Sequence, residues 1–163
     1  MTRIRHRRTR LLVAVVAALG IVAALGAPVL AGAPQRVTIV SNVTFNPNGP
    51  NFGDFTATGP AVVSGVVCAT GTFVDIGLKF QGFESNRGMV QLQVIKEFTC
   101  DDGSGTFVVK LQIQANFDTG IESFSWVVLG GTGDHSALRG AGRGSTVPTD
   151  TGNINTYSGF LLD

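Results

Sequence analysis

The stretch Ser123–Gly144 reads SFSWVVLGGTGDHSALRGAGRG and contains the chain's only tryptophan, Trp126. Its first seven residues favour a strand, because β-branched and aromatic residues dominate them. Three glycines in the next four positions indicate a tight turn. The second glycine-rich run, from Leu138 to Gly144, then predicts a strand that returns alongside the first.

The N-terminal segment has a different character from the rest of the chain. Arginines within the first ten residues precede an apolar run from Leu11 to Leu30, which ends in small residues. This order predicts a secretory signal peptide over residues 1–31, cleaved after Ala31, and therefore a secreted, extracytoplasmic protein. An uncleaved anchor is the alternative, because about 20 apolar residues also span a bilayer. We expect membrane contact only through this segment, and only if it is not cleaved.

Charge and length restrict the remaining chain. Five of the twelve basic residues lie in the first ten positions and all eleven acidic residues lie beyond Arg36, so residues 32–163 have a net charge of −4. A mildly acidic domain lacks the basic surface that nucleic-acid binding needs. Its length fits one domain with one core.

Alternating apolar and polar residues recur along this domain. We expect further strands at 36–45, 61–68, 72–82, 90–98, 106–117 and 153–162, and either a strand or a loop at 52–59. Short turns that contain glycine connect them, and no segment has helical periodicity. About eight strands of this kind predict an all-β antiparallel barrel or sandwich. We favour the barrel, because closure removes the edge strands.

The alternation also predicts which side chains face inward. In 72–82 the apolar residues Val74, Ile76, Leu78 and Phe80 share one face and Asp75, Lys79 and Gln81 share the other. The segment 106–117 has six apolar residues in step and is the clearest strand of the chain.

The two cysteines, Cys68 and Cys100, are expected to form a disulfide, since the chain is predicted to be exported. In the chain-entropy description this bond stabilises the fold by about 3–4 kcal/mol. A reactive thiol pair is the alternative, but the cysteines lack the close spacing of such motifs. We expect no metal site, because His135 is the only histidine of the mature chain and is interpreted as a solvated loop residue.

A few polar residues are candidates for chemistry. Glu122 shares the face of Phe124 and Trp126 and is either an inward acid or a solvated residue at the rim. Lys96 interrupts an apolar face, which indicates a binding residue, a bulge or a position at the mouth. A Lys96–Glu122 pair is a further hypothesis. Arg139 and Arg143 are expected to face solvent.

Aromatic residues supply the candidate ligand contacts. Trp126, Phe124 and Tyr157 are expected inside the barrel, where they form either the core or the wall of a ligand site. No sequence motif indicates a cofactor.

Three segments together resemble a known superfamily. They are Trp126–Gly133, Leu138–Gly142 and Asn155–Gly159, and they resemble the allene oxide cyclase and dirigent-like barrels. The cysteine-containing turn Phe98–Gly105 makes the chain most similar to secreted bacterial members. The resemblance implies an eight-stranded antiparallel barrel with an apolar interior, and it makes a homo-oligomer an expectation. It transfers no catalytic residue, because the acids of the plant proteins match no local motif here.

These observations lead to three functional hypotheses. The leading one is an exported barrel that binds a small hydrophobic molecule. The second is a cyclase-like or isomerase-like enzyme that acts on a small apolar substrate, with Glu122 as the candidate acid. The third is a non-catalytic structural or interaction protein of the cell envelope.

Overall fold

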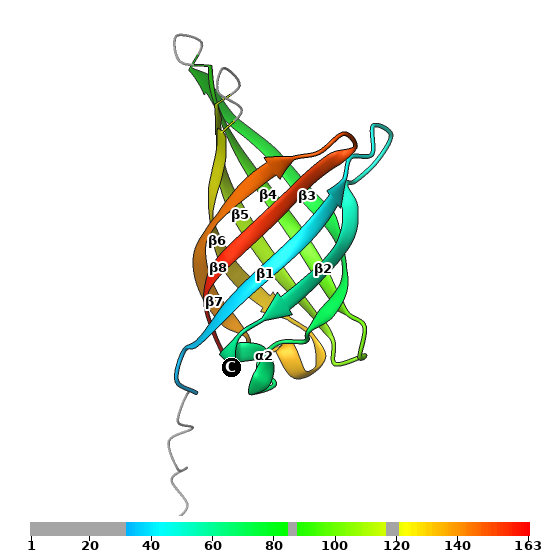
Figure 1. The fold of residues 1–163 in the computed structure, drawn as a ribbon, viewed down its shortest axis with the longest axis vertical. Helices are drawn as coiled ribbons and strands as arrows, with labels where there is room; N and C mark the ends of the chain where they lie inside the picture. Colours follow the sequence, from blue (N-terminus) through cyan, green and yellow to red (C-terminus); the bar gives the residue numbers. More distant parts are fainter. Residues whose placement is uncertain (1–31, 85–87, 117–120) are drawn as a thin grey trace, which may run out of the picture. The chain divides into compact units, whose positions relative to one another are not determined.

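Eight strands close into an antiparallel barrel in which each strand pairs with its neighbours in the chain and β1 pairs with β8 (Figure 1). The computed structural model describes residues 32–84, 88–116 and 121–163, and residues 32–163 form one compact unit. The strands are β1 (Gln35–Thr44), β2 (Phe52–Thr58), β3 (Thr70–Glu84), β4 (Met89–Cys100), β5 (Thr106–Asn116), β6 (Ile121–Gly131), β7 (Arg139–Pro148) and β8 (Gly152–Leu162). The predicted all-β barrel is confirmed. The expected turns at 86–88 and 118–120 lie wholly or largely outside the described residues.

The glycines of β7 make room for aromatic rings. A Cβ atom on Gly142 would lie 2.8 Å from Trp126 Cε2, and one on Gly159 of β8 would lie 2.6 Å from Trp126 Cζ2. A Cβ atom on Gly144 would come still closer to the ring of Phe124. Side chains at these positions would push the rings out of the core. The glycine-rich run that predicted a returning strand is therefore also the surface on which the β6 aromatics pack.

A short helix, α2 (Pro60–Val63), and the 3₁₀ turn η2 (Gly133–His135) lie at one end of the barrel (Figure 1). The prediction of a strand over 61–68 is wrong. Pro60 fixes φ and starts the helix, whose turn is continued by bonds from Ser64 N to Pro60 O (2.9 Å) and from Val66 N to Ala61 O (2.9 Å). The segment then buries Val67 against the core.

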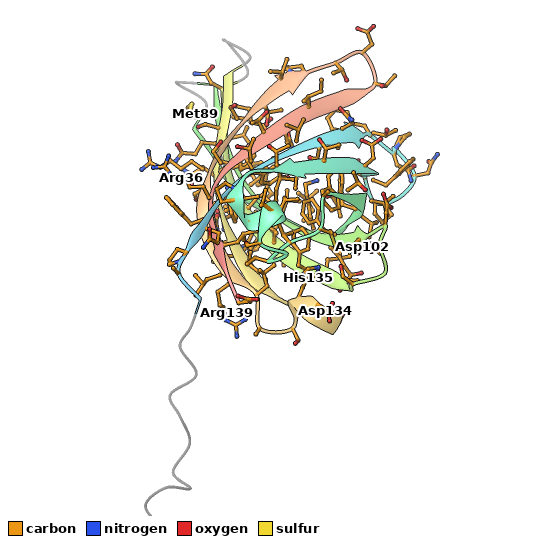
Figure 2. The ribbon with its side chains drawn as sticks, turned by 60° about the horizontal axis from the view of Figure 1, so that its bottom comes forward. Arg36, Met89, Asp102, Asp134, His135 and Arg139 are labelled. Carbon is orange, nitrogen blue, oxygen red and sulfur yellow. A yellow bond between two sulfur atoms is a disulfide. The ribbon has the colours of Figure 1, made fainter. Side chains whose placement is uncertain are left out.

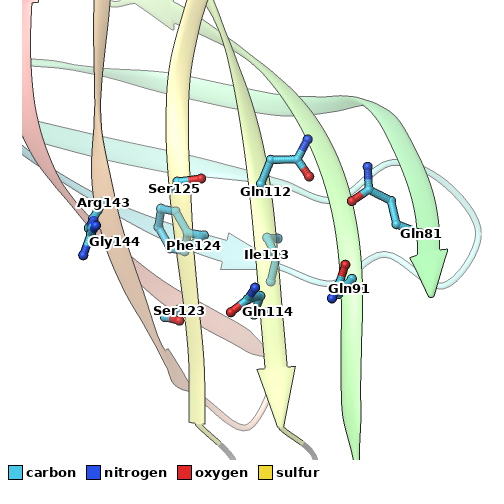
Figure 3. Close-up of a pocket in the computed structure, with 10 residues that line it drawn as sticks. All are labelled: Gln81, Gln91, Gln112, Ile113, Gln114, Ser123, Phe124, Ser125, Arg143 and Gly144. Atoms are coloured by element: carbon cyan, nitrogen blue, oxygen red, sulfur yellow. The ribbon is translucent and has the colours of Figure 1, made fainter. Parts of the chain in front are cut away.

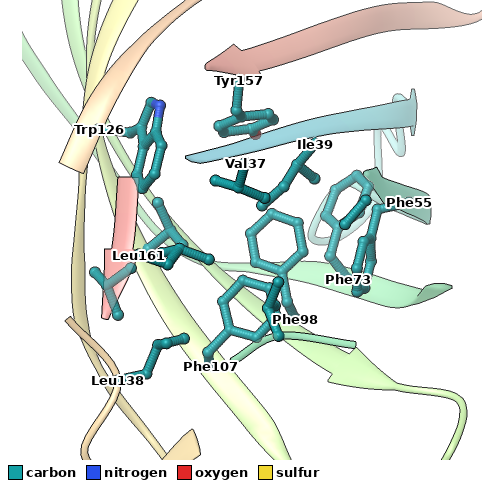
Figure 4. Packing of buried hydrophobic residues seen from close by; sticks show 14 of the residues in the cluster. Val37, Ile39, Phe55, Phe73, Phe98, Phe107, Trp126, Leu138, Tyr157 and Leu161 are labelled. Atoms are coloured by element: carbon teal, nitrogen blue, oxygen red, sulfur yellow. The ribbon is translucent and has the colours of Figure 1, made fainter. Parts of the chain in front are cut away.

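Aromatic side chains fill the interior near α2 (Figure 4). Phe98 and Phe107 stack with ring centroids 4.8 Å apart, and Phe55 meets both rings edge-on. Tyr157 closes the group from β8, 6.1 Å from Phe98. We call Phe55, Phe73, Phe98, Phe107 and Tyr157 the aromatic cluster. Such contacts add to the stabilisation that burial of the rings provides.

A bulge in β3 changes which face its residues occupy. Asp75 pairs with Lys96 but Gly77 pairs with Ile95, so Ile76 is the extra residue. The prediction that Val74 and Ile76 face inward is therefore wrong, and Asp75 faces inward instead. Beyond the bulge Leu78 and Phe80 return to the inner face, as their pairing with Val94 and Leu92 shows. They are 73% and 60% exposed, because β2 pairs with β3 only as far as Val74.

None of the helices among the described residues has the length and apolar character that a transmembrane helix needs.

Candidate ligand-binding site

Six strands each place a polar residue at the inward position next to an apolar or glycine residue, on the side away from α2. We call these residues the polar layer: Ser41 of β1, Asp75 of β3, Lys96 of β4, Glu122 of β6, Thr146 of β7 and Asn155 of β8. Asp75 follows Phe73, Lys96 precedes Phe98 and Asn155 precedes Tyr157, each by two residues. Alternate residues of a strand share a face, so these polar groups point into the same interior as the rings.

Four members of the layer lie side by side across the barrel wall. Ser41 pairs with Asn155, Asn155 with Thr146, and Thr146 with Glu122. The Thr146 hydroxyl lies 2.9 Å from Glu122 Oε1 and 3.0 Å from Asn155 Oδ1. One hydroxyl proton is shared between the two acceptors, and each of these oxygens has a second lone pair that can accept a hydrogen bond. This wall therefore offers acceptor oxygens to the interior.

The other two members form a buried ion pair. Lys96 Nζ lies 2.5 Å from Asp75 Oδ1, and only 4% of the Lys96 side chain and 13% of the Asp75 side chain are exposed. Asn51 Nδ2 donates to Asp75 Oδ2 at 3.2 Å, and the Lys96 ammonium lies 4.4 Å from the Phe73 ring centre. The inward orientation considered for Lys96 is what the structure has, with no bulge at this position of β4. Its ion-pair partner is Asp75, not Glu122.

Burial governs the charge of Lys96. It lowers the pKa of the Lys96 ammonium, while the nearby carboxylates of Asp75 and Glu122 oppose that shift. Glu122 is therefore close enough to act on Lys96 electrostatically, although the two do not form a salt bridge. Two carboxylates and one ammonium share this part of the interior.

Two hydroxyl groups, one in the layer and one next to it, form no hydrogen bond of normal geometry with the described residues. They are Ser41 Oγ and Tyr157 Oη, and both side chains are buried. Burial raises the pKa of Tyr157, and weak hydrogen bonding from the adjacent Ser41 and Asn155 side chains opposes that rise, so the phenol stays protonated. Buried polar groups without partners are rare in folded proteins. These two mark the place where a bound molecule could complete the hydrogen bonding.

The predicted aromatic contacts form the inner wall next to these groups. Trp126, Phe124 and Tyr157 are buried, and the Phe124 and Tyr157 rings lie 4.9 Å apart. Trp126 Nε1 donates to the Arg143 carbonyl at 3.2 Å, so its polar group is satisfied within the protein. Trp126 is a core residue, whereas the Tyr157 hydroxyl forms no hydrogen bond of normal geometry with the described residues. Arg139 and Arg143 are exposed, as expected.

Sequence reasoning missed four members of the polar layer: Ser41, Asp75, Thr146 and Asn155. For Ser41 a signal existed, because it interrupts an apolar series formed by Val37, Ile39 and Val43. Asp75 could not be found in this way, because the bulge at Ile76 reverses the face on which it appears.

A second polar cluster lies at the α2 end. Cys68 and Cys100 form the predicted disulfide, with Cα atoms 5.9 Å apart. The interpretation of His135 as a solvated loop residue is wrong, because only 2% of it is exposed. The η2 turn exposes Asp134 and directs His135 inward, where Nε2 lies 3.2 Å from Cys100 Sγ and 3.0 Å from Ser104 Oγ (Figure 2).

The outer surface also has a groove of about 390 Å³ (Figure 3). Polar side chains of neighbouring strands line it, among them Gln91, Gln112, Gln114, Ser123, Ser125 and Arg143. Of the predicted ligand contacts, only Phe124 borders this groove. None of the six polar-layer residues lines this groove.

No protein-family model and no curated protein matches this chain.

Proposed function

We propose that this protein is an exported barrel that binds a small, mainly apolar molecule carrying a polar group. The molecule enters from the end opposite α2, and its polar group contacts the polar layer. The observation that carries the proposal is a pair of adjacent buried hydroxyls, Ser41 Oγ and Tyr157 Oη, which form no hydrogen bond of normal geometry within the described residues. Each costs free energy in the empty protein, and a ligand that hydrogen-bonds to them removes that cost.

The surroundings of the layer fit such a ligand. On the α2 side of the layer, the aromatic cluster forms an apolar surface. On the side of the layer away from α2, the exposed Leu78 and Phe80 lie on the inner face of β3, where they offer apolar contacts to the apolar part of the ligand. Ligand sites of this kind combine apolar walls with a few converging polar groups.

A second candidate is an acid–base enzyme acting on the same class of molecule. Glu122 is a carboxylate that faces the interior, and Tyr157 is a protonated phenol on the neighbouring wall. In this candidate, one group of the pair removes a proton from the substrate and the other donates a proton to it, as an isomerisation or a cyclisation requires. The resemblance to allene oxide cyclase barrels supports this candidate, but fold similarity alone does not establish activity.

Export is part of the proposal. Its support is the N-terminal order of basic, apolar and small residues, together with a disulfide, which persists mainly in oxidising compartments.

Native mass spectrometry of the protein purified from its own source tests the proposal. We expect a mass above that of the polypeptide, lost on denaturation, and the released compound is then tested for turnover. The bare polypeptide mass in both states would contradict the proposal and favour a structural protein of the envelope. The same spectra report the signal cleavage site and the number of subunits, and so test the expected homo-oligomer.

A further inference from the structure

Glu122 is an acidic group of the polar layer with which no cation of the described residues forms a salt bridge. The Lys96 ammonium is paired with Asp75. Within the part of the chain that the structure describes, the Glu122 carboxylate accepts one hydrogen bond, from the Thr146 hydroxyl at 2.9 Å. Two carboxylates and one ammonium therefore leave the layer with one unbalanced negative charge. Because Glu122 is half-buried, water screens this charge less than it would at the surface.

Further acceptor oxygens lie along the barrel wall beside Glu122. Asn155 Oδ1 is 3.0 Å from the Thr146 hydroxyl that Glu122 also contacts, and it has a second lone pair. The buried Tyr157 hydroxyl lies next to Asn155 and Ser41 and forms no hydrogen bond of normal geometry within the described residues. A carboxylate, an amide oxygen and a phenol oxygen can therefore all accept a hydrogen bond from a bound molecule.

Aromatic rings lie beside these oxygens. Phe124 follows Glu122 by two residues on the inner face of β6, and the ring centroids of Phe124 and Tyr157 lie 4.9 Å apart. The face of an aromatic ring attracts a cation. The Lys96 ammonium already uses such a contact, 4.4 Å from the centre of the Phe73 ring. The surroundings of Glu122 therefore favour a positive charge on the bound molecule.

Building on the proposed function, we propose that the molecule bound in the barrel carries a primary ammonium group, held by Glu122, Asn155 and Tyr157. A primary ammonium has three N–H donors and no acceptor, which matches three acceptor oxygens. Tyr157 Oη accepts from the ammonium and donates its own proton to the adjacent Ser41 Oγ.

Other head groups fit this wall less well. A hydroxyl group has one donor and leaves the charge of Glu122 unbalanced. A carboxylate would be repelled by Glu122. The net charge of −4 of residues 32–163 also attracts cations and repels anions. The alkyl part of the amine then contacts the exposed Leu78 and Phe80 on the inner face of β3.

Decylamine, decanol and decanoate test the proposal, because they share one alkyl chain and differ only in the head group. Each is titrated below its micelle concentration into the folded protein with its disulfide intact. Calorimetry gives the affinity and stoichiometry, and the fluorescence of Trp126, whose ring lies 6.3 Å from that of Tyr157, reports binding in the barrel. We expect one decylamine per chain, bound about tenfold more tightly than decanol, because charge-assisted hydrogen bonds are stronger than neutral ones. Decanoate should bind most weakly.

Two variants separate the carboxylate of Glu122 from the net charge of the domain. Glu122→Gln keeps the shape of the side chain and removes its charge, so it should weaken decylamine binding about tenfold and leave decanol binding unchanged. Glu97→Gln is the matched control, because it removes the same charge from the outward face of β4, where Glu97 alternates with the inward Lys96 and Phe98. It should bind all three probes as the wild type does.

The possible outcomes distinguish the head group from the proposed function. Decanol binding as tight as that of decylamine would overturn the ammonium proposal, whereas a molecule bound in the barrel would still support the proposed function. Unchanged decylamine affinity in Glu122→Gln, or equal losses in Glu122→Gln and Glu97→Gln, would overturn it too. If none of the three probes binds, the ammonium proposal is wrong, and the native mass of the purified protein decides separately whether another molecule occupies the barrel.

Discussion

The interior near α2 and the interior beyond it are built on the same strands but contain different chemistry. Near α2, Phe98 and Phe107 are fully buried, and they stack on each other. On the side away from α2, the polar layer begins, for example at Lys96, two residues before Phe98 on β4; it contains an ion pair and a buried hydroxyl, Ser41 Oγ, without a hydrogen bond of normal geometry. We expect the first region to stabilise the folded state and the second to add little stability or to reduce it. Groups that cost stability and remain in an interior are expected where a protein binds or reacts.

The largest expected effect is on the aromatic cluster. Phe98→Ala removes a fully buried ring that contacts Phe55, Phe73, Phe107 and Tyr157, so the free energy of unfolding should fall by about 3–5 kcal/mol. Denaturant unfolding measures the loss. A change below about 1 kcal/mol would mean that this half of the barrel does not provide the stability assigned to it.

The ion pair should respond differently to single and double replacement. Lys96→Met leaves the Asp75 carboxylate buried without its ammonium, and we expect a loss of about 3 kcal/mol. In Lys96→Met/Asp75→Leu both charges are gone, so most of that loss should be recovered. If Lys96→Met/Asp75→Leu is less stable than Lys96→Met, the ion pair stabilises the fold. The proposed difference between the aromatic interior and the polar layer would then be wrong.

The smallest expected effect at neutral pH is that of Tyr157→Phe, within about 1 kcal/mol, because the removed hydroxyl has no partner. At alkaline pH the variant should differ from the wild type. Burial raises the folded-state pKa of Tyr157 above the ordinary value of 10.0, so the unfolded state loses a proton that the folded state keeps. The wild type should therefore lose stability as the pH rises above about 10, and Tyr157→Phe should lose less.

Tyr157 is the only tyrosine, so tyrosinate absorbance reports on it alone. We expect this absorbance to appear together with unfolding. A tyrosinate transition near pH 10 in protein that remains folded would show that the phenol is accessible to solvent.

Much of the barrel could be predicted from the sequence, because its signals are local. The alternation in β5 gave the correct inward residues from Phe107 to Ala115, and the glycines of β7 correctly marked a strand beside Trp126. The α2 segment was misread because Val66 and Val67 resemble strand residues, although Pro60 begins a helical turn. Valine side chains are buried in helical turns as well as in strands, so their apolar character alone did not identify the conformation of this segment.

The candidate site was harder to predict, because it depends on neighbours that are distant in the chain. The position of Lys96 gave a local signal, but its partner Asp75 became visible only once the bulge at Ile76 was known. His135 looked like a loop residue, since nothing near it in sequence indicates its contact with Cys100. Both the Lys96–Asp75 ion pair and the His135–Cys100 contact join residues that are far apart in the sequence.

The most direct test of a ligand site in the polar layer compares two serines of the barrel wall by native mass spectrometry. Ser41 is fully buried with a free hydroxyl, whereas Ser158 on β8 is exposed and faces outward. Ser41→Ala should keep the stability of the wild type or exceed it, yet lose the bound mass, while Ser158→Ala should keep both. If Ser41→Ala retains the bound mass at wild-type occupancy, the molecule does not bind at the polar layer.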